Sequence, residues 1–126
     1  MKYMLLIYGA ENAWTETERE ECYRESTQLA TELNAAGQYL AASPLQPVST
    51  AMTVQVRNGR PLVTDGPFAE MREQLGGYFL IEATDKNEAL SIAARIPAAR
   101  VGKVEVRPVL EIGGLPAPSG TAGGRS

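Results

Sequence analysis

The chain of 126 residues contains no histidine and a single cysteine, Cys22. Without histidine there is no Ser-His-Asp or Cys-His nucleophile, no histidine general base and no histidine-ligated zinc. One cysteine forms no disulfide within the chain and offers no pair of thiolates to a metal. We therefore expect no metal and no cofactor. Any proton transfer would use carboxylates, tyrosines, lysines or Cys22.

The chain also lacks an excess of basic residues. Lys and Arg total 12 against 15 Asp and Glu, so the formal net charge is -3. Because nucleic-acid-binding surfaces need clustered positive charge, direct contact with DNA or RNA is not expected. The sparing use of cysteine suits a reducing, cytoplasmic location.

Long apolar runs are missing as well. No run approaches the roughly 18 apolar residues that suggest a membrane-spanning helix, so we expect no membrane contact. The apolar start, residues 1–9, is short and has no Ala-x-Ala-like cleavage site. It therefore predicts a first strand rather than a signal peptide.

The length fits one domain that can bury a core without disulfides or a structural metal. Beyond residue 112 the chain is rich in Gly, Pro and Ser and poor in large apolar groups. We expect a single domain over residues 1–112 and a flexible tail over residues 113–126.

Two helices are predicted from their end signals. Thr15 and Glu18 have the spacing of a capping box, and Gly37 is placed to end the first helix in a left-handed conformation. Asp85 is the expected cap of the second helix, which Pro97 ends. One face of the first helix recurs at three- and four-residue steps, and its small side chains suggest close packing on a sheet: Cys22, Ser26, Leu29, Ala30, Leu33 and Ala36.

Strands are predicted over residues 3–8, 52–57, 60–64, 77–83 and 103–107, with Asn58-Gly59 as the turn of a hairpin. This order predicts an α+β fold, a ferredoxin-like βαββαβ with an extra hairpin. Residues 3–8 and 78–81 are apolar on both faces and are expected as central strands, with 52–57 and 103–107 outside them. Because two helices cover only one face, we expect a second copy on the other, giving a homodimer.

The segment Asp65-Gly66-Pro67-Phe68 closely resembles the signature of the DGPF proteins, a branch of the YCII-related family. Further matches follow in the family's order over roughly residues 1–110: Gly37, Leu45-Gln46-Pro47, Leu75-Gly76-Gly77-Tyr78 and Val104-Glu105-Val106-Arg107-Pro108. The resemblance implies a dimeric α+β barrel, similar to muconolactone isomerase, and no established reaction. It also implies an association with extracytoplasmic-function sigma factors. Some YCII-related proteins carry a His-Asp pair, whose histidine this chain cannot supply.

Asp65 is the candidate catalytic residue, because its carboxylate at the end of the hairpin could line a cleft near Arg72. The alternative is structural, since Asp at the start of a turn accepts hydrogen bonds from backbone amides just downstream. Arg72, Tyr78 and Arg107 are candidate ligand-binding residues. Their alternatives are local ion pairing for the arginines and packing for the tyrosine. Phe68 is interpreted as a core or interface anchor.

Two further features of the sequence have structural interpretations. Trp14, just before the Thr15 cap, is interpreted as a hydrophobic staple, with a lid over the sheet end as the alternative. Gly76-Gly77 lacks the spacing of a phosphate-binding loop, so strand entry or a bulge is favoured.

Two classes of function remain open. The first is a small-molecule-binding protein or a proton-transfer, isomerase-like enzyme with a pocket near Asp65. The second is a non-catalytic interaction or regulatory module, linked to a sigma factor. A deep cleft with convergent polar groups favours the first, and an exposed apolar patch favours the second.

Overall fold

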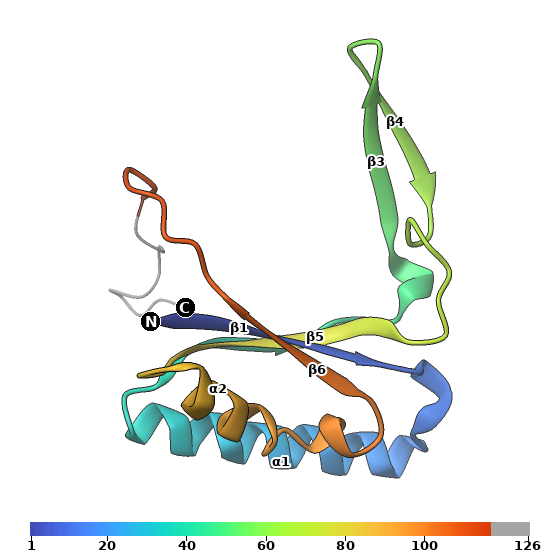
Figure 1. The fold of residues 1–126 in the computed structure, drawn as a ribbon. Helices are drawn as coiled ribbons and strands as arrows, with labels where there is room; N and C mark the ends of the chain where they lie inside the picture. Colours follow the sequence, from blue (N-terminus) through green and yellow to red (C-terminus); the bar gives the residue numbers. More distant parts are fainter. Residues whose placement is uncertain (117–126) are drawn as a thin grey trace.

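A computed structural model of the protein describes residues 1–116, and its two layers are seen in Figure 1. Helices α1 (Glu16–Ala35) and α2 (Lys86–Ala93) cover one face of a four-stranded antiparallel sheet. The sheet order is β2-β5-β1-β6, and its strands are β1 (Lys2–Gly9), β2 (Tyr39–Pro44), β5 (Gln74–Glu82) and β6 (Lys103–Pro108). The predicted α+β, ferredoxin-like fold is confirmed. Most of the predicted tail, residues 117–126, lies outside the described residues.

The hairpin forms a separate sheet of its own. Among residues 1–116, strands β3 (Met52–Arg57) and β4 (Arg60–Asp65) pair only with each other, and in Figure 1 they rise away from the helices. The prediction that residues 52–57 form an outer strand of the main sheet is wrong, because β2 occupies that position beside β5. The sequence of β2 is short, contains small residues and ends in proline, so its strand signal is weak.

The central positions of β1 and β5 are confirmed. On the helix side, their buried residues form the core with the helices: Tyr3, Leu5, Phe79, Ile81, Leu29, Leu33, Ala89, Ile92 and Ile96. On the other side, Met4 pairs with Leu80 and Leu6 with Tyr78, and all four side chains are partly exposed. This side, the open face of the sheet, has no cover from the part of the chain that the structure describes.

The predicted start signals of both helices and the end signal of α1 are confirmed, whereas α2 ends at Ala93, before Pro97, which begins a 3-10 turn. The amide of Glu18 donates to Thr15 Oγ1 at 3.1 Å, and the amide of Thr15 donates to the Glu18 carboxylate at 2.9 Å, which completes the capping box. Gly37 has φ +76° just after α1, and Asp85 accepts from the amide of Glu88 at the start of α2. Neither described helix is long and apolar enough to cross a membrane.

The two helices cover the sheet unequally. At 1.5 Å per residue, α1 is about 30 Å long and α2 only about 12 Å. The chain then continues as a short 3-10 turn, η3 (Pro97–Arg100), before it enters β6. The end of the sheet near Gly9 and Gly77 is therefore covered mainly by the first half of α1 and by segment 96–101.

Candidate functional site

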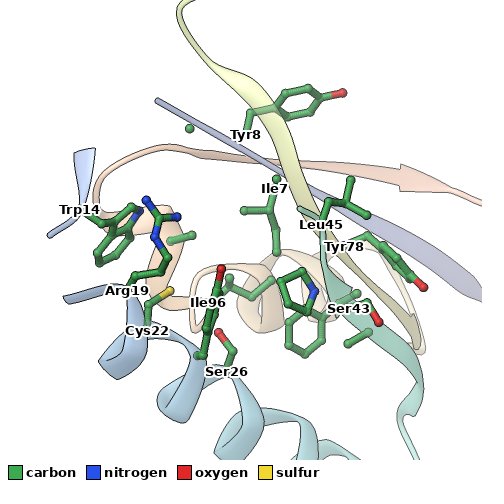
Figure 2. Close-up of a pocket in the computed structure, with 18 of the residues that line it drawn as sticks. Ile7, Tyr8, Trp14, Arg19, Cys22, Ser26, Ser43, Leu45, Tyr78 and Ile96 are labelled. Carbon is green, nitrogen blue, oxygen red and sulfur yellow. The ribbon is translucent and has the colours of Figure 1, made fainter. Parts of the chain in front are cut away.

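A cleft of about 890 Å³ lies between residues 19–30 of α1 and the sheet. Its apolar wall comes from all three neighbouring strands and from the segment after α2: Ile7, Ala42, Phe79, Ile96, Ala98 and Val101. Figure 2 shows Ile7 directed toward α1 and the neighbouring Tyr8 directed away, as strand alternation requires. The cleft thus opens on the helix side of the sheet, opposite to the open face.

The space arises from small side chains on α1. Cys22, Ser26 and Ala30 follow each other at four-residue steps and line the cleft, so they form one stripe along the helix. Farther along, Leu29 and Leu33 are buried and fill the core. Close packing is therefore confirmed for Leu29, Ala30 and Leu33. At Cys22 and Ser26 it is wrong, because these small side chains leave a gap.

Glycines shape the strand end of the cleft. In the pairing of β1 with β5, Ile7 is opposite Gly77 and Tyr8 is opposite Leu75, which leaves Gly76 as the extra residue of a bulge. The predicted bulge is confirmed. A Cβ at Gly77 would lie 3.0 Å from the Ser43 carbonyl oxygen, so glycine permits the close approach of β2.

Arg19 is the cation of the cleft. It is half-buried, and its guanidinium donates to the Glu11 carbonyl oxygen at 2.7 Å. No salt bridge among residues 1–116 involves it. In Figure 2 it lies next to Trp14 at one end of the cleft, while Ser43 and Tyr78 lie toward the other. The residue four places after the Thr15 cap is Arg19, so the apolar partner of a staple is missing and that interpretation of Trp14 is wrong.

Cys22 supplies a thiol to the same cavity. Burial raises the pKa of this thiol above its ordinary value of 9.0, although the Ser26 hydroxyl lowers it in part. At neutral pH the group is therefore a neutral thiol and a poor nucleophile.

The sequence-predicted site residues do not gather in the cleft. Tyr78 borders it, but its side chain lies on the open face, beside that of its ladder partner Leu6. Arg72 is exposed and lines a second, shallower hollow of about 540 Å³ together with Gly66 and Glu70. Arg107 lies on the open face of β6, where it is 4.0 Å from the Glu105 carboxylate. The structure therefore brings Arg72 close to the Asp65-Gly66 turn, but neither Asp65 nor Arg72 lines the main cleft.

Asp65 ends β4 and is exposed, in the ladder position opposite Met52. Its carboxylate takes part in no hydrogen bond within residues 1–116. The turn is instead held by the Gly66 amide, which donates to the Ala51 carbonyl at 2.7 Å, and by the Thr53 hydroxyl, which donates to the Gly66 carbonyl at 2.9 Å. The prediction that Asp65 caps this turn is therefore wrong.

Metal binding has no framework in the described residues. No group of three His, Cys, Asp or Glu side chains gathers as a ligand set within residues 1–116. The carboxylate nearest the cleft, Glu11, already accepts from the Val48 amide at 2.7 Å.

Comparisons with known proteins agree on one family. The profile of the YCII-related domain matches residues 1–113. An uncharacterised protein of Rhizobium meliloti (strain 1021) is 35% identical over 114 residues, which cover 86% of this chain and 92% of the relative.

Proposed function

This chain belongs to the YCII-related family, and we propose that it binds a small apolar molecule with an anionic group in the cleft between α1 and the sheet. The observation that carries the proposal is the cleft itself. Its volume of about 890 Å³ falls within the range of about 300–1,000 Å³ that is usual for small-molecule sites. Such sites combine mainly apolar walls with a few polar groups that orient the ligand.

The apolar part of the ligand would lie against Ile7, Phe79 and Ile96. These side chains belong to different elements and bound the same space. A planar or branched hydrocarbon of this size gains free energy by leaving water, at about 25 cal/mol for each Å² of apolar surface buried.

The anionic group would lie near Arg19. A guanidinium stays charged at all relevant pH values and carries five N–H donors. One of its hydrogen bonds goes to the Glu11 carbonyl, which leaves donors for a carboxylate, phosphate or sulfonate. Half-burial strengthens such a contact because the surrounding dielectric is lower than in bulk water.

Binding without turnover is better supported than proton-transfer catalysis. A general base must be free to take a proton within hydrogen-bond reach of the ligand. The Glu11 carboxylate is engaged by Val48, and the raised pKa of Cys22 keeps its thiol protonated. An isomerase-like reaction would therefore need a base that neither Glu11 nor Cys22 provides.

We also propose that the protein is a cytoplasmic homodimer of the DGPF branch. The motif of residues 65–68 supports the branch, and the lone Cys22 supports a reducing location. The open face supports the dimer, because Met4, Leu6 and Leu80 on its central strands are apolar and partly exposed. Two such faces packed together would enclose a barrel.

The ligand proposal is tested with two dyes that differ in charge. Anilinonaphthalene sulfonate is an apolar anion, and N-phenylnaphthylamine is its uncharged counterpart. We expect Arg19→Gln to weaken sulfonate binding about tenfold, since a hydrogen bond to a charged group contributes more than a neutral one. Binding of the neutral dye should change little. Arg24→Gln is the matched control, because Arg24 is an exposed arginine on the same helix, paired with Glu21.

A second pair of variants tests the location. Ser26→Leu fills the cleft and should abolish binding of both dyes, whereas Gln28→Leu adds the same side chain to the exposed side of α1. Equal dye affinity in Ser26→Leu and the wild type would overturn the proposal. An equal loss of sulfonate affinity in Arg19→Gln and Arg24→Gln would overturn the proposal that Arg19 binds the anionic group.

A further inference from the structure

The β3–β4 hairpin, residues 52–65, has one apolar and one mainly polar face. In the ladder, Val54 is opposite Val63 and Val56 is opposite Pro61, so these side chains share a face with Met52. Asp65, opposite Met52, ends this face at the base of the hairpin. Val54 is 63% and Val56 71% exposed. The alternate positions of β3 are Thr53, Gln55 and Arg57. We call residues 52–65 the arm and its valine-bearing side the apolar face of the arm.

The arm has no partner in the described part of the chain. It forms a sheet of two strands that stands clear of the main sheet in Figure 1. An isolated two-stranded hairpin is marginally stable in water and needs a third layer or strand. A contiguous set of exposed apolar side chains on such an element marks an interaction surface.

The position of the arm indicates what covers it. Figure 1 shows the arm rising on the side of the main sheet that faces away from the helices, which is the side of the open face. A molecule seated on the open face therefore also meets the arm. At the base of the arm Phe68 is 86% exposed, so this aromatic side chain is not part of the core and is available as an interface anchor.

The charges of the open face favour a second copy over a charged partner. Glu82 is 2.6 Å from the N-terminal ammonium, Lys2 is 3.9 Å from Glu111, and Lys103 is 2.8 Å from Glu73. Arg107 has Glu105 nearby. Contact about a two-fold axis presents the same patch from both molecules. Such contact brings like charges together unless each charged side chain is already paired within its own chain, as those of the open face are.

We propose that the arm packs its apolar face on a second copy of this chain, the same copy that covers the open face. The inference rests on the proposed dimer and adds a second contact region outside the barrel. Each copy contributes one arm and receives one. The five apolar side chains on the apolar face of each arm are then removed from water: Met52, Val54, Val56, Pro61 and Val63.

The test is sedimentation velocity of the full chain over a concentration series around about 10 µM, where assembly depends on mass action. The wild type should be dimeric. Val54→Lys places a charge on the apolar face of the arm and should raise the dimer dissociation constant at least tenfold. Gln55→Lys adds the same side chain one residue along the same strand, on the other face, and should leave the constant unchanged.

Each outcome decides a different point. A dimeric wild type with unchanged dissociation in Val54→Lys would overturn the arm contact and leave the sheet-face dimer standing. Equal weakening by Val54→Lys and Gln55→Lys would also overturn it. A monomeric wild type would overturn both the arm contact and the dimer, and would favour a different protein as the occupant. None of these outcomes bears on dye binding in the cleft.

Hydrogen exchange of the wild type provides a second measurement that needs no variant. Amides of β3 and β4 should exchange more slowly above the dissociation constant than below it, because a covered hairpin opens less often. The amides of α1 on the far side of the sheet serve as the internal reference. Exchange in the arm that does not depend on concentration would overturn the proposal even if Val54→Lys failed to fold.

Discussion

Cys22 shows how one side chain reports on the cleft around it. Its pKa is raised mainly by burial, so the folded protein holds the thiol proton more tightly than the unfolded chain does. The resulting stabilisation is fully present below the unfolded pKa. It is lost as the pH rises from about 9.0 through the higher folded pKa.

We predict that alkylation of Cys22 by iodoacetamide accelerates about tenfold per pH unit up to pH 9 without levelling, because the thiolate is the reactive form. The urea-unfolded chain, whose thiol has its ordinary pKa, should begin to level near pH 9.0. Rates measured by mass spectrometry that reach a plateau below pH 8 in the folded protein would contradict the effect of burial.

A second prediction at the residue scale separates Asp65 from Gly66. Asp65→Ala should change the free energy of unfolding by less than about 0.5 kcal/mol, as for other exposed positions without a partner. Gly66→Ala should cost about 1 kcal/mol or more, because Gly66 has φ +93°, which alanine adopts with strain. Urea unfolding measures both. A larger loss for Asp65→Ala than for Gly66→Ala would restore a structural role for the carboxylate.

The sequence predicts residues with local roles well and residues of the cleft poorly. Thr15, Gly37 and Asp85 act within a few positions of themselves, so their spacing is sufficient. Arg19 and Cys22 acquire their roles only because a gap opens between α1 and the sheet. The four-residue stripe of small side chains is visible in the sequence, but such a stripe is compatible with close packing as well as with a cleft. The short length of α2, which leaves one end of the sheet less covered, is not evident from that stripe.

At the scale of elements, the ends of α1 govern its stability. The capping box satisfies two backbone donors that would otherwise lack partners. Thr15→Ala should therefore destabilise the protein by about 1 kcal/mol. Thr17→Ala, inside the first turn, should be neutral or slightly stabilising because alanine favours the helix. Thermal unfolding of the two variants provides the comparison, and equal stability would contradict the contribution of the cap.

The strands illustrate a different limit of sequence reasoning. The hairpin was predictable as a hairpin, because alternation and Asn58-Gly59 are local signals; Asn58 and Gly59 indeed have φ values of +51° and +75°. The position of the hairpin outside the main sheet is not predictable, since period-two alternation does not determine which strand is the neighbour. β2 was missed because Ala41, Ala42 and Pro44 form a poor strand pattern that only pairing with β5 stabilises.

For the whole molecule, the absence of histidine and of a second cysteine leads to a prediction about metals. Dialysis of untagged protein against EDTA should leave its melting temperature unchanged, since the sequence lacks the histidines and paired cysteines that hold structural zinc. Bovine carbonic anhydrase treated with a zinc chelator in parallel confirms that the procedure removes metal. Stoichiometric zinc that survives dialysis, found by elemental analysis, would contradict the prediction.

The family is predictable from the motif of residues 65–68 together with further matches over roughly residues 1–110, and the family profile matches residues 1–113. The two-layer architecture is predictable from the order of helices and strands. The assembly follows less directly. Apolarity on both faces of β1 and β5 indicates that a cover is needed, whereas the extent of the apolar face of the arm becomes visible only when the arm is seen to stand apart.

The arm also makes chains that have not assembled prone to aggregate. Because β3 and β4 form a sheet of their own, one side of each backbone has no strand partner in the described part of the chain. Open strand edges beside apolar side chains recruit further strands and start fibrous aggregates. Arg57 and Arg60 lie opposite each other at the tip and discourage such addition there. At the base Asp65, opposite Met52, acts in the same way. Aggregation of unassembled chains should therefore begin between the two ends, along Val54 to Val56.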